Sequence, residues 1–206
     1  MKTDVITIHS DLTGSKAAMQ TAEHFCEYNN ITGKNAMHIR LLTEETVSMV
    51  HGILRGFKGK LWLESQDTED GILCRICLRA DKSVDMEQED QLMSVSTSGK
   101  NESVKGVLGK IREIFRRTVQ STSTEPSAVD TWYYMGAQRN ALMNSVDTFS
   151  NYWSLNYYRQ NVEGPAKNQE AWDELEKSII GKLADEVKIG LRNSTAEVII
   201  EKTVKK

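Results

Sequence analysis

Apolar and polar residues alternate in several short segments of the chain and recur with a helical period in longer ones. Alternation with a period of two predicts strands, and apolar residues at every third or fourth position predict helices that bury one face. The strands are expected at residues 4–9, 60–65, 72–80, 187–191 and 196–200. The helices are expected at residues 16–28, 35–54, 105–119, 132–158 and 171–183. Strands and helices are grouped rather than strictly alternating. This order favours an α/β two-layer sandwich, with a mixed, mainly antiparallel sheet and helices on one face.

Turn and loop residues divide the same chain into its parts. The acidic turn 66–71 and the polar turn 192–195 each join two strands, which predicts two antiparallel hairpins. The Ser/Thr-rich run 120–127 ends in Glu-Pro and indicates a boundary. We therefore expect a single domain over residues 1–206, with a helical, aromatic-rich insertion at residues 120–168.

Composition and charge exclude several classes of protein. The chain of 206 residues has 26 basic and 29 acidic side chains, and its net charge of -3 argues against general binding of nucleic acid or anionic membranes. No apolar run approaches the roughly 20 residues that a membrane span requires. The N-terminal residues have the pattern of a strand rather than of a signal peptide. An odd number of cysteines, three, suits a reducing compartment, so we expect a cytoplasmic protein.

Cys74 and Cys77 form a C-x-x-C sequence, which raises the possibility of a metal or redox site. They lie in an apolar run that is predicted to be a strand, and residues three apart on a strand point to opposite faces. The sequence has no second C-x-x-C and no histidine pair at the spacing of metal ligands. We therefore predict buried free thiols and no metal site.

The order of elements resembles the GHKL ATPase domain, the fold of the ATP-binding domains of histidine kinases. The resemblance covers residues 1–119 and 169–204, and the anti-sigma-factor kinases are the nearest relatives that it suggests. It implies a bacterial regulatory protein that binds ATP, with magnesium in the active members, and that phosphorylates a protein partner.

The helix of this family that holds magnesium carries a Glu and, four residues later, an Asn. Residues 41–52 resemble it: Glu45 takes the position of the Glu, which implies a catalytic base, and His51 and Gly52 follow as in the family. Met49 stands where the family has Asn. A thioether is a poor ligand for a hard cation, so this position argues against magnesium.

The two other motifs of the family match in part. Asp81 and Asp85 lie where the family has Asp-x-Gly-x-Gly, whose Asp binds adenine, but both glycines are missing. Gly99, Gly106 and Gly109 resemble the glycine-rich loop that cradles phosphates at a helix N-terminus. The resemblance therefore implies a nucleotide site at Met49, Asp81, Asp85, Gly99, Gly106 and Gly109.

Two hypotheses of function follow from these motifs. In the first, the chain is an ATP-binding kinase with Glu45 as its base. In the second, it is a pseudo-ATPase that kept the fold and acts as a protein-interaction or dimerisation module. The missing Asn and glycines favour the second. Ordinary interpretations stay open for the same residues: a solvated helix face for Glu45, a turn for Asp81, and packing or loop roles for the glycines.

Large apolar residues in the insertion recur at spacings of three, four and seven. The series is Trp132, Met135, Leu142, Val146, Phe149 and Trp153. Such a seam is typical of a helix that packs against another helix, and its aromatic residues suit an interface with a partner or a second copy. The alternative is a helix that packs in the chain's own core. A platform for nucleic acid is not expected, because Arg139 and Arg159 are the only clear cations of the segment.

Overall fold

The structure is a computed structural model that describes residues 1–51, 57–81, 111, 114–115, 152–156, 159, 178–192 and 195–205. The helices that it describes from end to end are α1 (Ser15–Tyr28), α2 (Gly33–His51) and α8 (Ile179–Leu183). Its strands are β1 (Ile6–His9), β2 (Lys58–Thr68), β3 (Gly71–Asp81), β4 (Tyr152–Ser154), β5 (Glu186–Arg192) and β6 (Thr195–Val204).

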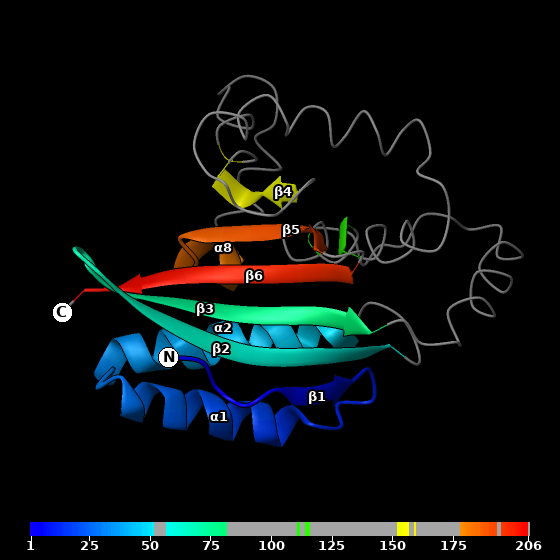
Figure 1. The fold of residues 1–206 in the computed structure, drawn as a ribbon, viewed down its shortest axis with the longest axis horizontal. Coiled ribbons are helices and arrows are strands. Elements are labelled where there is room, and N and C mark those ends of the chain that lie inside the picture. The colour runs from blue at the N-terminus through cyan, green and yellow to red at the C-terminus, as the bar shows by residue number, and fades with distance from the viewer. Residues whose placement is uncertain are drawn as a thin grey trace, which may run out of the picture.

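The strands form one sheet in the order β1-β2-β3-β6-β5-β4, and every neighbouring pair is antiparallel. Figure 1 shows the strands in this order from bottom to top, with α2 behind β2 and β3 and with α8 behind β5. Helix α2 contacts α1, α8 and the central strands β3 and β6. The described part of the chain is thus an open sheet with helices against one face, as predicted, and its described strand pairs are all antiparallel where the sequence analysis predicted a mixed, mainly antiparallel sheet.

The two predicted hairpins and the first two helices are confirmed, with small shifts at their ends. Strand β2 runs to Thr68, so the first turn is limited to residues 69–70 instead of 66–71. Gly71 closes it with φ 140°, and a Cβ there would lie 2.2 Å from the carbonyl oxygen of Val204. Only glycine fits this position without strain.

The prediction of a continuous helix over residues 171–183 is wrong at Ser178. This residue is extended (φ -74°, ψ 133°) and its Oγ accepts a hydrogen bond from the backbone N–H of Gly181 at 3.2 Å. It is therefore the N-cap of α8, which begins at Ile179. At the other end, the Arg159 guanidinium donates to the carbonyl oxygens of Gly181 and Ala184 and satisfies acceptors that the helix leaves open.

The prediction of helix over residues 132–158 is wrong at residues 152–154, which form β4. This strand extends the sheet at β5, where Trp153 pairs with Ile189. The Ser154 hydroxyl donates to Glu186 Oε2 at 2.9 Å and the Asn156 N–H donates to Glu186 Oε1 at 3.2 Å, which fixes the end of the strand. The free edge of β5 offers backbone partners to an aromatic segment, and this pairing outweighs the helical spacing of its apolar residues.

The main core lies between the sheet and the helices. On β3 the core side chains are those of Cys74, Ile76, Leu78 and Ala80, and they alternate with residues of the other face. The other face carries a small apolar cluster of Trp62, Cys77 and Ile199, which are direct neighbours on β2, β3 and β6. Cys74 and Cys77 thus lie on opposite faces, as predicted, and both are buried free thiols.

Candidate functional site

Helix α2 carries the residues that the family resemblance singles out. Its buried side chains recur at every third or fourth position and comprise Ile39, Leu42, Thr43, Thr46, Val47, Met49 and Val50. The two threonine hydroxyls donate to the carbonyl oxygens four residues before them, at 2.8 Å for Thr43 and 2.7 Å for Thr46. These polar groups are therefore satisfied within the helix, and the whole buried face is available for packing.

Glu44, Glu45 and Met49 have three different environments on this helix. Glu44 is exposed, Glu45 is half-buried at the border of the packed face, and Met49 has 0% of its surface exposed. Met49 belongs to the main hydrophobic core. The position that would hold magnesium in the family is thus occupied by a core side chain without a hard oxygen ligand.

His51 ends α2 and connects the helix to the first strand. Its Nδ1 lies 2.5 Å from the carbonyl oxygen of Ser10, just after β1. The backbone N–H of Ser10 donates to the carbonyl oxygen of Phe57 at 3.0 Å, just before β2. His51 therefore holds the end of α2 next to the ends of two strands.

Asp81, the candidate for adenine recognition, is the last residue of β3. Its backbone pairs with Lys58 at the start of β2, and Ala80 beside it is buried in the main core. Helix α2 contacts β3 and ends near the start of β2, so Glu45 and Asp81 belong to adjoining elements.

Most of the other predicted site residues lie outside the described residues. These are Asp85, Gly99, Gly106 and Gly109 of the nucleotide site, and Trp132, Met135, Leu142, Val146 and Phe149 of the aromatic seam. Their predicted roles stay predictions.

The predicted helix at residues 105–119 is described at three positions. Ile111, Ile114 and Phe115 are helical and buried, as their spacing predicts. The ring of Phe115 meets the ring of Phe57 edge to face, with centroids 5.9 Å apart. This segment therefore packs beside the start of β2.

Trp153, the last residue of the predicted seam, is described. It has 7% of its surface exposed and belongs to the main core, with Leu155 beside it. Its indole is thus part of the chain's own packing. This position favours the core alternative for Trp153, and its membership of a helical seam is wrong because it lies in a strand.

The second face of the sheet carries a polar network that the sequence analysis did not identify. Lys2 and Arg79 place their cations 4.5 Å and 5.2 Å from the centre of the Trp62 ring. Arg79 also donates to Glu197 at 3.0 Å, and Arg75 donates to Glu201 at 3.0 Å on the same strand pair. Cross-strand ion pairs and stacked cations of this kind cover the small apolar cluster. The network therefore has a structural role.

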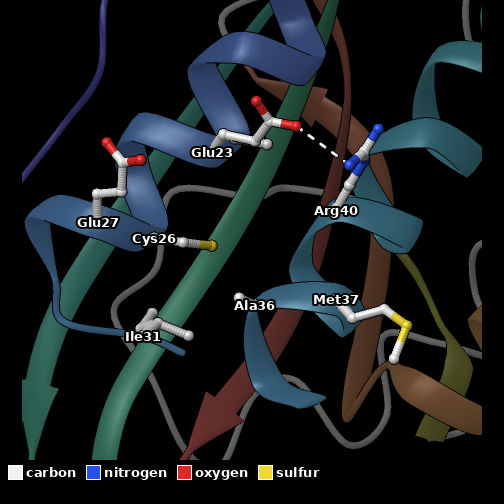
Figure 2. A pocket seen from close by; sticks show the side chains of 8 residues that line it. Glu23, Cys26, Glu27, Ile31, Ala36, Met37 and Arg40 are labelled. Atoms are coloured by element: carbon white, nitrogen blue, oxygen red, sulfur yellow. Dashed lines mark ion pairs between the residues drawn. The ribbon is translucent and has the colours of Figure 1, made fainter. Parts of the chain in front are cut away.

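The sequence analysis also did not identify a pocket of about 360 Å³ between α1 and α2. Its lining includes Glu23, Cys26 and Glu27 of α1 and Ala36, Met37 and Arg40 of α2, and Figure 2 shows Cys26 and Ala36 facing the space between the two helices. Sequence patterns predict the buried face of each helix, but the pocket depends on how the two helices pack, which those patterns do not specify.

Comparisons with known proteins give no match: no family model, no curated protein and no solved structure is similar to this chain. Among the helices that the structure describes, none is long and apolar enough to cross a membrane. Within the same described ranges, no group of three His, Cys, Asp or Glu side chains is placed to hold a metal ion.

Proposed function

We propose that this chain is a cytoplasmic bacterial regulatory protein with a GHKL-like ATPase fold, and that it acts by binding a protein partner or a second copy of itself. The antiparallel sheet with α1 and α2 on one face supports the fold. The family's magnesium-dependent phosphotransfer is not part of this function. ATP can still be a ligand without turnover.

The burial of Met49 carries this proposal. In the family an amide oxygen at this position binds the magnesium that bridges the nucleotide phosphates. Here the side chain is fully buried in the main core, and its thioether sulfur is a poor ligand for a hard cation. Without the metal, the charge that develops on the transferred phosphoryl group has lost its main source of stabilisation.

A second candidate function is an ATP-dependent protein kinase, and the environment of Glu45 favours it. Glu45 is half-buried, whereas the neighbouring Glu44 is exposed. A carboxylate at the border of a packed face is better placed to act as a general base than a fully solvated one.

The rate of ATP hydrolysis in the presence of magnesium separates the two functions. Glu45→Gln removes the candidate base, and Glu44→Gln is the matched control on the adjacent exposed residue. We expect the wild type and both variants to release ADP at the same background rate. Hydrolysis by the wild type that is lost in Glu45→Gln and kept in Glu44→Gln would overturn the proposal in favour of the kinase.

A further inference from the structure

The pocket between α1 and α2 has an apolar floor that is fixed by the end of α1. Asn30 has the left-handed conformation (φ 54°), the N–H of Ile31 donates to the carbonyl of Cys26 at 2.8 Å, and the N–H of Asn30 donates to the carbonyl of Glu27 at 3.1 Å. These two bonds form a Schellman motif, which ends a helix and brings its flanking apolar residues together. Cys26 and Ile31 are accordingly both buried and both line the pocket.

The opposite wall comes from the first turns of α2. Ala36 is half-buried against the core and Met37 is 55% exposed at the rim. Figure 2 shows Ala36 facing the space between the two helices, with Cys26 and Ile31 across from it. The volume of about 360 Å³ lies at the lower end of the range of ligand pockets. The pocket thus offers one apolar site for a guest side chain.

The charges around the pocket leave one carboxylate without a cation. Arg40 of α2 pairs with Glu23 of α1 at 3.1 Å, as the dashed line in Figure 2 shows. Glu27 forms no ion pair with any residue that the structure describes, including the exposed Lys34 at the start of α2. The last turn of α1 has no basic residue, so Glu27 lies unfavourably at the negative end of the helix dipole.

The pKa of the Cys26 thiol at the floor of the pocket is affected by the same carboxylates. Burial raises the pKa of Cys26 to about 11, and the carboxylates of Glu23 and Glu27 raise the pKa in the same direction. The pocket therefore combines an apolar floor with a rim that favours a positive charge.

We infer that this pocket binds a short segment of a partner protein that carries an aliphatic side chain next to a lysine or arginine. The aliphatic side chain packs on Cys26, Ile31 and Ala36, and the cation pairs with Glu27. Complementary charge selects such a segment over an acidic one. The inference deepens the proposed function, because it locates the surface at which a protein-binding module would meet its partner.

The probe for this site is a fluorescein-labelled peptide of sequence Gly-Lys-Leu-Leu-Arg-Gly, with a matched peptide in which Glu replaces Lys and Arg. Fluorescence anisotropy at low salt gives the affinity. Selective labelling of alanine methyl groups gives the location, with Ala36 in the pocket and Ala80 outside it. We expect saturable binding of the basic peptide, a shift of the Ala36 methyl signal and no shift of the Ala80 signal.

Two variants and one control test the contacts. Glu27→Gln is expected to weaken binding about two- to fivefold, the range of an exposed ion pair. Ala36→Leu fills the pocket and is expected to reduce binding at least tenfold, while its melting temperature shows that the protein stays folded. Glu44→Gln removes an exposed carboxylate of α2 outside the pocket and is expected to leave the affinity unchanged.

Equal affinities for the basic and acidic peptides, or a shift at Ala80 without one at Ala36, would overturn the inference. So would a pocket occupied by a second copy, seen in light scattering as a dimer of the wild type that Ala36→Leu dissociates. The peptide-binding assays contain no nucleotide, so their outcome is independent of the ATP hydrolysis assay. Failure of peptide binding with background ATP hydrolysis rejects this site alone, whereas Glu45-dependent hydrolysis rejects the proposed function alone.

Discussion

Replacing Met49 by Asn introduces the side chain that the GHKL family has at the corresponding position and tests whether this position belongs to the core or to a ligand site. Met49 is fully buried in the main core. The substitution removes a buried apolar side chain, which costs about 1.5–3 kcal/mol. It also buries an amide without a designed partner, which costs a further ~1–3 kcal/mol in proteins. The expected loss of unfolding free energy is therefore about 2.5–6 kcal/mol, a large part of the ~5–15 kcal/mol of a typical domain.

This loss is large enough to measure by chemical or thermal denaturation followed by circular dichroism. For a chain of this size each kcal/mol lowers the melting temperature by roughly 2–4 °C, so Met49→Asn is expected to melt roughly 5–24 °C below the wild type. Met49→Leu is the control, because a swap of similar volume between apolar residues costs less than about 1.5 kcal/mol. A Met49→Asn variant as stable as Met49→Leu, and further stabilised by ATP with magnesium, would refute the assignment of this side chain to the core.

Three other predictions concern stability and reactivity. Burial of the Asp185 carboxylate opposes its ionisation, but hydrogen bonds from the Thr203 N–H and from Lys202 outweigh it and lower the pKa. Ionised Asp185 therefore stabilises the fold above about pH 4, the unfolded pKa, and this contribution is lost as the pH falls through the lowered folded pKa. Asp185→Asn should destabilise the protein at pH 7 in urea titrations, and a gap to wild type that stays constant down to pH 2 would contradict this. Gly71→Ala should cost roughly 1–3 kcal/mol of unfolding free energy, because the new Cβ would clash with the end of β6. Gly33→Ala is the control and should cost less, since Gly33 also has a positive φ but has open space around it. Equal melting temperatures of the two variants would contradict this prediction. Cys26, with a pKa of about 11, should react with iodoacetamide at pH 8 far more slowly in the folded than in the urea-unfolded protein, as followed by mass spectrometry.

The parts of the fold that depend on local patterns could be predicted from the sequence. Helices α1 and α2 follow from apolar spacing, and the hairpin of β2 and β3 follows from alternation around a short polar turn. The same alternation places Cys74 and Cys77 on opposite faces. These features need only neighbouring residues, because period and turn chemistry act within one or two elements.

Features that depend on distant partners could not be predicted. The three residues of β4 become a strand because β5 provides an edge about thirty residues later in the chain. Helix α8 starts after Ser178 because the Ser178 side chain caps the helix by accepting from the Gly181 N–H. A single Ser within an amphipathic pattern is only a weak sequence signal for a helix start.

The candidate site was predictable in part. The sequence placed Glu45 and Met49 on one helix, but it assigned Met49 to a nucleotide site, and the burial of this side chain in the main core needed the structure. The pocket between α1 and α2 needed the structure, because it arises from the packing of Ile31 and Ala36 across the helix pair.

The most direct test of the proposed function is the melting temperature with ATP, measured with magnesium and with a chelator, against magnesium alone. A ligand that binds only the folded state at a hundred times its dissociation constant stabilises it by about 2.7 kcal/mol. That stabilisation corresponds to a shift of roughly 5–10 °C for a chain of this size. We expect the shift with ATP, whatever its size, to be the same with magnesium and with the chelator. A shift that appears or grows by several degrees only when magnesium and ATP are both present would contradict the proposal and show that the nucleotide site still uses the metal.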